Sequence, residues 1–350
     1  MRVLFDIGHP GHVHLFKNVA HNLKRGGDEV LFTVRDKEHE IDLLKSEGLP
    51  YIRMGRHYSS GAGKIWGLVY YNFRVLFISL RFSPDMYMSH GSIYTLLSTL
   101  ILRKPNIALE DSGNDEQVRL YLPFSRAVIT STSFPFRYGA KQILYEGYHE
   151  TAYLHPNYFR ADESVTAELG LKEGERYFIV RFVAWNATHD RKNSGLTAGQ
   201  KREIVDLLSL SGRVFISSEA PLPEDLRAYR LPLRPERIHH ALSFATLFVG
   251  EGATMASESA VLGTYAVYIN TIRRGYLEEQ EREYGLVSCF TEFDGVIEKL
   301  RELLDNPALK SETKRKGERL IKEKCDLTEY LTRFITEWPD SYRSAQKELK

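Results

Sequence analysis

Short apolar runs alternate with longer amphipathic segments along the first half of the chain. The short runs are rich in β-branched and aromatic residues, which is typical of buried strands. The longer segments repeat apolar residues every three or four positions, which is typical of helices. The expected strands are residues 2–7, 29–34, 85–89, 106–109 and 127–130, with another near Tyr51, and the expected helices are 13–24, 38–47, 64–81 and 93–102.

The same alternation starts again after a break in the pattern. Residues 147–160, which include Pro156, interrupt it and are the expected linker. Beyond the linker, the expected strands are 177–182, 213–217, 246–249 and 265–269, and the expected helices are 198–208, 237–243 and 254–262. From Phe293 onward the chain is charge-rich and is expected to be helical.

Strands that alternate with helices predict a doubly wound parallel sheet, and two such series predict two Rossmann-like domains of the α/β class. The length of 350 residues fits two domains of ordinary size. We expect an N-terminal domain over 1–153, a C-terminal domain over 154–335 and a helical tail over 336–350. Because ligands bind beyond the carboxyl ends of parallel strands, we expect the two domains to face a common cleft.

The composition restricts the classes of function. Hydrophobic residues make up 43% and charged residues 27% of the chain, which is typical of a soluble globular protein. The formal net charge of +1 gives no basic signal for nucleic-acid binding. Two cysteines, Cys289 and Cys325, make neither a disulfide framework nor a paired metal motif. Without a signal-peptide pattern or a membrane-spanning apolar run, we expect a cytoplasmic protein.

The segment 248–270 has the pattern of a ligand site. It reads as a strand, a glycine turn, a helix and a second strand, with Gly250 and Gly252 at the turn. Thr254 is the expected N-cap, and Glu258 follows it on the same helix face. Such a helix N-terminus suits a phosphate, and a nearby carboxylate suits the diol of a ribose. The alternative is an ordinary βαβ unit in which Glu258 is solvated.

Histidines follow two of the expected strands in the first half. His9, His12 and His14 surround the glycines after the first strand, and His90 follows the strand 85–89. Histidine can donate, accept or transfer a proton near neutral pH, so His12 is a candidate for substrate contact, with structural capping as the alternative. The His-x-His spacing lacks a third ligand, so no metal site is expected.

An acidic loop follows the strand 106–109. It runs from Glu110 to Asp115, and Asp111 is our first candidate for a general base if burial or a neighbouring carboxylate raises its pKa. The alternative is a simple turn, because aspartate, serine, glycine and asparagine favour turns by themselves.

A charged loop follows the first strand of the second half. His189 and Arg191 lie in it among other charged residues, and such side chains pair with the oxygens of a diphosphate. A solvated loop is the alternative. Residues 237–240, which include His239 and His240, either line a pocket for the base or only begin a helix.

The helix expected at 64–81 is strongly aromatic and apolar. Its charged residues are Lys64, Arg74 and Arg81, all of them basic. A helix of this composition can lie on a membrane surface. Packing against the sheet is the alternative, and the need for a crossover helix between parallel strands favours it.

Five segments together are similar to a known family. They are DIGHPGHVH at 6–14, YLHP at 153–156, RFVAW at 181–185, SE at 218–219 and GEGATMASE at 250–258. On these segments the chain is identified as a member of domain-of-unknown-function family 354, and the resemblance runs nearly end to end. It implies the GT-B fold and a relation to enzymes that use nucleotide sugars.

Two better-understood groups of enzymes resemble parts of the chain. In the N-acetylglucosaminyltransferase of peptidoglycan precursor synthesis, a glycine-rich loop ends in a histidine, as Gly11-His12 does here. The ribose-binding Ser-Glu pair of that enzyme is similar to Ser257-Glu258. In non-hydrolysing UDP-N-acetylglucosamine 2-epimerases, a His-Gly-Asp strand end is similar to residues 90–92, but Ser92 stands in place of the aspartate.

The resemblance implies a metal-independent glycosyltransferase that uses a nucleotide-activated, UDP-linked sugar in cell-envelope or surface glycan synthesis. The donor-binding residues that it implies are Gly252, Ala253, Thr254, Ser257, Glu258, His189 and Arg191, and the catalytic residues are His12, His90 and Asp111. The nucleotide sugar is a substrate, so no cofactor is expected. Since the chain has no Asp-x-Asp element, no metal is expected to bridge the diphosphate.

The expected partners are a nucleotide-sugar donor and a glycan or lipid-linked acceptor. A membrane surface, at the inner face of the membrane, is a further partner that the sequence leaves open. Two other functions also stay open. One is an enzyme like the non-hydrolysing UDP-N-acetylglucosamine 2-epimerases, and the other is a protein that binds a nucleotide sugar without turnover.

Overall fold

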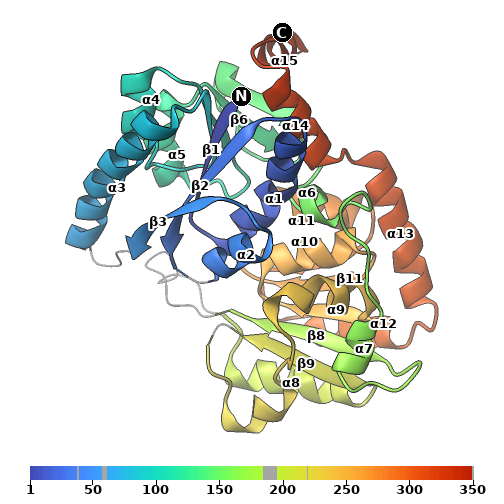
Figure 1. Cartoon of the computed structure of the whole chain (residues 1–350). Coiled ribbons are helices and arrows are strands. Elements are labelled where there is room, and N and C mark those ends of the chain that lie inside the picture. The colour runs from blue at the N-terminus through green and yellow to red at the C-terminus, as the bar shows by residue number, and fades with distance from the viewer. Residues whose placement is uncertain (38, 57–60, 184–194, 219, 349–350) are drawn as a thin grey trace. The chain divides into compact units, whose positions relative to one another are not determined.

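The computed structural model describes residues 1–37, 39–56, 61–183, 195–218 and 220–348. The chain divides into two units (Figure 1). The first unit consists of Met1–Tyr153 together with Cys325–Lys350, and the second consists of Leu154–Lys324.

A seven-stranded parallel sheet forms the centre of the first unit. Its strands are β1 (Arg2–Ile7), β2 (Glu29–Asp36), β3 (Tyr51–Arg56), β4 (Met86–His90), β5 (Asn106–Leu109), β6 (Ala127–Ser131) and β7 (Gln142–Tyr145). They lie in the order β3-β2-β1-β4-β5-β6-β7, and every pair is parallel. Successive strands are added on one side of β1 up to β3, and on its other side from β4 onward, so the order of strands reverses between β1 and β4. Crevices for ligands form at such a reversal, beyond the carboxyl ends of the strands.

Helices cover both faces of this sheet, as the alternating pattern predicts. They are α1 (Pro10–Arg25), α2 (Glu40–Ser46), α3 (Gly61–Phe82), α4 (Leu96–Leu102), α5 (Asp115–Tyr121) and α6 (Thr151–Leu154), with short 3-10 turns at η1 (Leu122–Phe124) and η2 (Gly139–Lys141). Figure 1 shows α3 and α4 on one side of the sheet and α1 and α2 on the other. α1 begins earlier than expected because His9 caps it by accepting a hydrogen bond from the Gly11 N–H.

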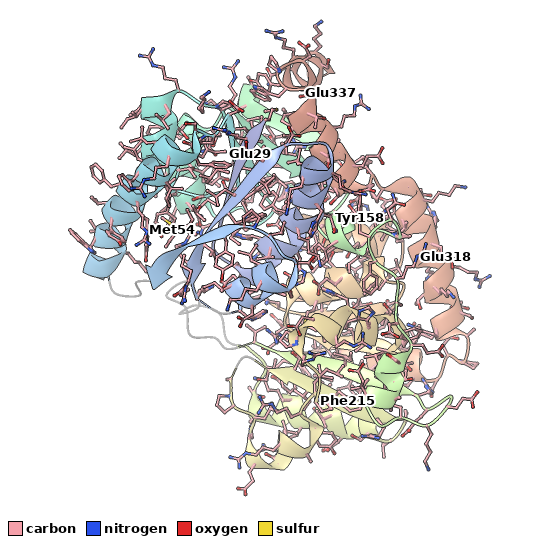
Figure 2. All side chains as sticks on the ribbon, viewed as in Figure 1. Glu29, Met54, Tyr158, Phe215, Glu318 and Glu337 are labelled. Carbon is pink, nitrogen blue, oxygen red and sulfur yellow. The ribbon has the colours of Figure 1, made fainter. Side chains whose placement is uncertain are left out.

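One face of α3 packs on the sheet, so the expected packing is confirmed for that face. Tyr71 and Val75 are buried against Met54 and Tyr87. Met54, which is labelled in Figure 2, is fully buried in this cluster. No helix in the described ranges is both long enough and apolar enough to cross a membrane.

A five-stranded parallel sheet forms the centre of the second unit. Its strands are β8 (Tyr177–Phe182), β9 (Arg213–Ser218), β10 (Leu247–Gly250), β11 (Tyr265–Ile269) and β12 (Val287–Phe290), in the order β12-β11-β10-β8-β9. The helices are α7 (Ser164–Glu168), α8 (Ala198–Ser209), α9 (Ile238–Phe244), α10 (Ala253–Val261), α11 (Gly275–Arg282), α12 (Val296–Leu304) and α13 (Leu309–Glu323), with η4 (Glu224–Tyr229) and η5 (Pro235–Arg237). β9 is added on one side of β8 and β10 on the other, so the order of strands reverses between β8 and β10. The carboxyl ends of these two strands therefore form the equivalent crevice.

Two strands at sheet edges were not predicted. β7 follows the strand at 127–130, which we expected to be the last of the first half, and β12 follows β11. Each has four residues. Each pairs with a single neighbour, so only the completed sheet stabilises them as strands.

The end of the chain returns to the first unit. Residues 325–335, which we expected in the C-terminal domain, form most of α14 (Leu327–Thr336), and this helix packs on α1. The Thr328 hydroxyl donates to the Ala152 carbonyl at 2.7 Å, and Asn22 donates to Thr332 at 3.3 Å. α15 (Asp340–Glu348) completes the same unit. The amphipathic pattern predicts the helix but cannot say which surface receives its apolar face.

Candidate functional site

Four polar side chains meet beyond the ends of β1, β4, β5 and β7 in the first unit. The rings of His12 and His90 stack, with centroids 4.7 Å apart. His90 Nε2 lies 2.9 Å from Asp111 Oδ1, and His149 Nδ1 lies 3.2 Å from Asp111 Oδ2. We call these four residues the histidine–aspartate cluster. The structure thus brings together the three predicted catalytic residues of the first half.

His149 is a member of the cluster that the sequence reasoning missed. It follows β7, and because that strand was not predicted, the sequence did not place this histidine at the end of a strand. Its Nε2 is buried and has no hydrogen-bond partner in the described part of the chain. A buried polar atom without a partner is costly, which makes this nitrogen a candidate for contact with a ligand.

The cluster carries separated charges at neutral pH. Burial by itself raises the pKa of the Asp111 carboxyl, but His149 and His90 outweigh it and hold that pKa well below its usual range. Burial lowers the pKa of His90, but the Asp111 charge outweighs it and raises the pKa to about 9. Burial and then the positive charge of His90 lower the pKa of His12 well below its usual value. Asp111 is therefore ionised, His90 is charged and His12 is neutral.

This charge state corrects one expectation. We expected Asp111 to be a base whose pKa is raised by burial or by another carboxylate. The structure gives the opposite direction, because two imidazoles rather than a carboxylate face Asp111. The sequence could not show this, since one of the two imidazoles comes from beyond β7.

Glu110 stabilises the loop that follows β5, and its carboxylate is not directed at the crevice. Its Oε1 accepts hydrogen bonds from the N–H groups of Ser112 (2.7 Å) and Gly113 (3.0 Å), and its Oε2 accepts from the Tyr121 hydroxyl at 2.6 Å. Glu110 is also buried. The turn that we considered as the alternative for this loop is therefore present, with Glu110 as its organising side chain.

A buried ion pair lies near Gly8, at the turn between β1 and the helix α1 that carries His12. Asp6 and Arg35 are 3.1 Å apart, and the hydroxyls of Thr33 and Ser92 also donate to Asp6. Gly8 leaves room for the Arg35 guanidinium, which a side chain at position 8 would overlap. Ser92, which stands in place of the epimerase aspartate, is therefore engaged in holding Asp6.

One set of residues in the described ranges can offer three ligand atoms to a metal ion. His90, Asp111 and His149 place such atoms within 4.8 Å of one another. Two imidazole nitrogens and a carboxylate suit zinc or iron. An ion would have to replace the two hydrogen bonds that Asp111 accepts from these imidazoles. His14, which we had considered as a ligand with His12, lies instead beside Tyr153.

In the second unit, the predicted phosphate site lies where β10 turns into α10. The N-cap of α10 is Gly252, with extended backbone angles, and not Thr254 as we expected. Ala253 and Thr254 therefore lie in the first turn, where backbone N–H groups have no carbonyl within the helix to bond. A side chain at Gly250 would overlap the Arg181 carbonyl, so the turn follows β8 closely.

Glu258 is held inside the unit by a histidine. Its Oε1 lies 2.9 Å from His239 Nε2, and both side chains are less than a tenth exposed. His239 is one of the two histidines that we considered for a base pocket. Ser257, the neighbour of Glu258, is fully buried and accepts a hydrogen bond from Gln280 at 2.8 Å. The Ser257 side chain thus packs α10 against α11.

Glu251 is a further residue that the sequence reasoning did not single out. It is buried, and it accepts hydrogen bonds from the N–H groups of Val183 at 3.1 Å and Leu196 at 2.7 Å. Those two residues flank a segment that contains His189 and Arg191, which lie outside the described residues. A charged residue between two glycines, directly after an apolar strand, was the signal that could have indicated this role.

Solved structures similar to this chain share its fold over almost the whole length. Staphylococcus aureus MnaA, solved with UDP, has a TM-score of 0.68 at 10% identity, with 97% of each chain covered. The UDP-GlcNAc 2-epimerase of Neisseria meningitidis, bound to UDP-GlcNAc, has a TM-score of 0.66 at 12% identity, covering 96% of this chain and 99% of that one. A glycosyltransferase of Streptomyces sp. SF2575 has a TM-score of 0.59 at 13% identity, covering 96% and 100%.

These likenesses show the GT-B fold that the sequence resemblance implied: two parallel-sheet α/β domains. Comparison with curated proteins finds no match. The model of a family described as "Protein of unknown function (DUF354)" matches residues 1–328. Since this match covers most of the chain, the protein belongs to the DUF354 family.

Proposed function

We propose that this protein is a GT-B glycosyltransferase that takes a sugar from a UDP-linked donor and transfers it without a metal ion. The observation that carries the proposal is Glu258, an ionisable side chain buried on α10 and hydrogen-bonded to His239 close to a helix N-terminus that begins at a glycine. A purely structural helix of this kind has no need of a buried carboxylate, which is costly to desolvate.

The donor would bind to the second unit in two parts. The ribose hydroxyls donate to the Glu258 carboxylate, and the diphosphate accepts from the N–H groups of Ala253 and Thr254 and interacts with the helix dipole. His189 and Arg191 would add positive charge to the diphosphate. As the bond to the sugar breaks, the same N–H groups stabilise the charge that develops on the leaving UDP.

The acceptor would be activated by the histidine–aspartate cluster. Transfer needs a base that removes the proton of the acceptor hydroxyl as the new bond forms. The His149 Nδ1–H group donates to Asp111, so in the neutral ring the lone pair lies on Nε2, the buried atom without a partner. We therefore assign the role of base to His149, with Asp111 fixing its tautomer. His90 and His12 would offer N–H groups to oxygens of the acceptor or the sugar.

Calorimetric titration with UDP and with UDP-sugars tests the donor site. The Glu258→Ala variant should bind UDP at least about tenfold more weakly, because hydrogen bonds to a charged group are lost. Glu298→Ala, at an exposed position of α12, is the matched control and should bind as the wild type does. An unchanged affinity in the Glu258 variant would remove the donor assignment.

The epimerase alternative is tested without an acceptor. The enzyme is incubated with UDP-N-acetylglucosamine alone, and the sugar is analysed for a new epimer by NMR. We expect none, because Ser92, which stands in place of the epimerase aspartate, is occupied by a structural hydrogen bond to Asp6. A new epimer would replace glycosyl transfer as the assigned reaction. If UDP-sugars bind but no acceptor yields product, the protein is a binding protein.

A further inference from the structure

The face of α3 and α4 that points away from the sheet is apolar and exposed to solvent. On α3, Trp66, Val69, Phe73, Phe77 and Leu80 recur at helical spacing along one stripe. The helix α4, which contacts α3, exposes Leu100 as well. Phe73 is 61% exposed, Leu80 is 58% exposed and Leu100 is 62% exposed. We call these six residues the α3–α4 face. Single exposed apolar residues are ordinary, but a contiguous stripe of them marks an interaction site.

The opposite face of α3 does not explain the stripe. That face packs on the sheet through Tyr71 and Val75, so the sheet already has its crossover helix. α3 is thus apolar on both sides, a pattern that is typical of a helix covered on both sides. Something other than its own sheet should cover the α3–α4 face.

The charges around this face are all of one sign along the helix. α3 contains Lys64, Arg74 and Arg81 and no acidic residue. The Arg81 guanidinium lies 4.2 Å from the centre of the Phe77 ring, and Arg74 donates to the Tyr70 hydroxyl at 2.7 Å. Both arginines therefore place their guanidinium groups beside exposed aromatic rings, as cationic side chains do at the boundary between lipid and water. Arg74 also donates to the Arg53 carbonyl at 2.9 Å.

A groove runs beside the same helix. Its volume is about 860 Å³, and its walls include Phe73, Phe77 and Phe82 of α3 and Leu31 and Ile52 of the sheet. Arg74 and Arg81 also border it. A space of this size with apolar walls suits an acyl chain, and two guanidinium groups at its border suit a phosphate head group.

We propose that the α3–α4 face docks this protein on the surface of a membrane that contains anionic lipids. Aromatic and aliphatic side chains would enter the head-group region, and Lys64, Arg74 and Arg81 would meet lipid phosphates. A second copy of the chain is a poorer occupant, because two such faces would bring like charges together. The docking does not rest on the proposed sugar transfer, although it would place the enzyme beside a lipid-linked acceptor.

Flotation of the full chain with vesicles tests the docking. The wild type should float with phosphatidylcholine vesicles that contain phosphatidylglycerol. The double variant Phe73→Ser, Phe77→Ser should bind these vesicles at least about tenfold more weakly, because two large side chains no longer leave water. Leu210→Ser, at a leucine that is 85% exposed in the second unit, is the control and should float as the wild type does. The proposal is overturned if the wild type does not float or if the double variant floats equally well.

The lipid charge is tested with a second pair of variants. Lys64→Gln and Arg81→Gln should each weaken binding to the anionic vesicles by about fivefold, the expected effect of one basic residue near such a surface. Neither should change binding to pure phosphatidylcholine. An equal loss on both kinds of vesicle would overturn the assignment to anionic lipid.

Sedimentation velocity without vesicles tests the other occupant. We expect the double variant and the wild type to sediment alike. A wild-type dimer that the double variant dissociates would show that a second copy covers the face, and the proposal would fail. Circular dichroism and UDP affinity should stay unchanged in the α3 variants, since Phe73 and Phe77 are more than half exposed and Lys64 and Arg81 are also exposed. If Glu258→Ala bound UDP as the wild type does, the donor assignment would fail, but the expected vesicle results would not change.

Discussion

His239 and Glu258 are joined by a 2.9 Å hydrogen bond that ties α9 to α10. Because a buried carboxylate needs donors, His239 keeps Glu258 in place before any ligand arrives. We expect His239→Ala to lower the free energy of unfolding by about 1.5–3 kcal/mol, the usual value for a hydrogen bond to a charged group. Urea denaturation measures this loss. His239→Gln, which can still donate, should restore part of the stability and of the UDP affinity, and no recovery would contradict the positioning role.

The pair of glycines before α10 gives a prediction with an internal control. A methyl group at position 250 would overlap the Arg181 carbonyl, which is fixed backbone, whereas at position 252 it would lie 3.2 Å from Cγ of the Arg181 side chain. Gly250→Ala should therefore destabilise the protein by about 1–3 kcal/mol, as overpacking does, and Gly252→Ala should cost less. Thermal unfolding compares the two. Equal losses would show that the turn does not depend on the close approach to β8.

The Glu251 carboxylate connects Val183 to Leu196 and should matter for both stability and binding. Glu251→Gln keeps one acceptor oxygen and should be milder than Glu251→Ala, which leaves both N–H groups unsatisfied at about 1–3 kcal/mol each. Denaturation measures the stability, and titration with UDP measures the affinity. If Glu251→Ala unfolds like the wild type, these bonds contribute nothing measurable.

The pair of His90 and Asp111 predicts a dependence of stability on pH. The folded state raises the pKa of His90 to about 9, whereas the unfolded chain has the ordinary value of about 6.5. The pair thus stabilises the fold fully below about pH 6.5, and the contribution, about 3 kcal/mol at most, is lost as the pH rises through 9. Urea denaturation from pH 6 to pH 10, with chelator present, should show this loss in the wild type and not in Asp111→Asn. A parallel loss in both proteins would assign it to other groups.

Metal independence is a separate prediction, because three residues of the cluster can also act as metal ligands. We expect transfer activity to survive EDTA and elemental analysis to find less than stoichiometric zinc or iron. Loss of activity with EDTA, recovery with zinc, and one bound zinc per chain in the wild type but not in His149→Gln would show that an ion replaces the two hydrogen bonds of Asp111.

The sequence by itself determined the parts of this protein that depend on local order. Alternating strands and helices gave the two doubly wound sheets, because hydrophobic periodicity is a property of consecutive residues. Residues directly after a predicted strand, such as His12, His90 and Asp111, could be assigned to one sheet edge, because parallel strands end together. The small residues before Glu258 likewise indicated a helix N-terminus.

Only the tertiary structure decided how distant residues meet. His149 joined Asp111 through β7, an edge strand that was not predicted, and this contact reversed the expected direction of the Asp111 pKa. α14 returned to the first unit because the complementary apolar surface is on α1. The exposure of the α3–α4 face also required the structure, since an apolar pattern is the same whether a helix is covered or bare. Charge, burial and pairing all depend on neighbours that the order of residues does not reveal.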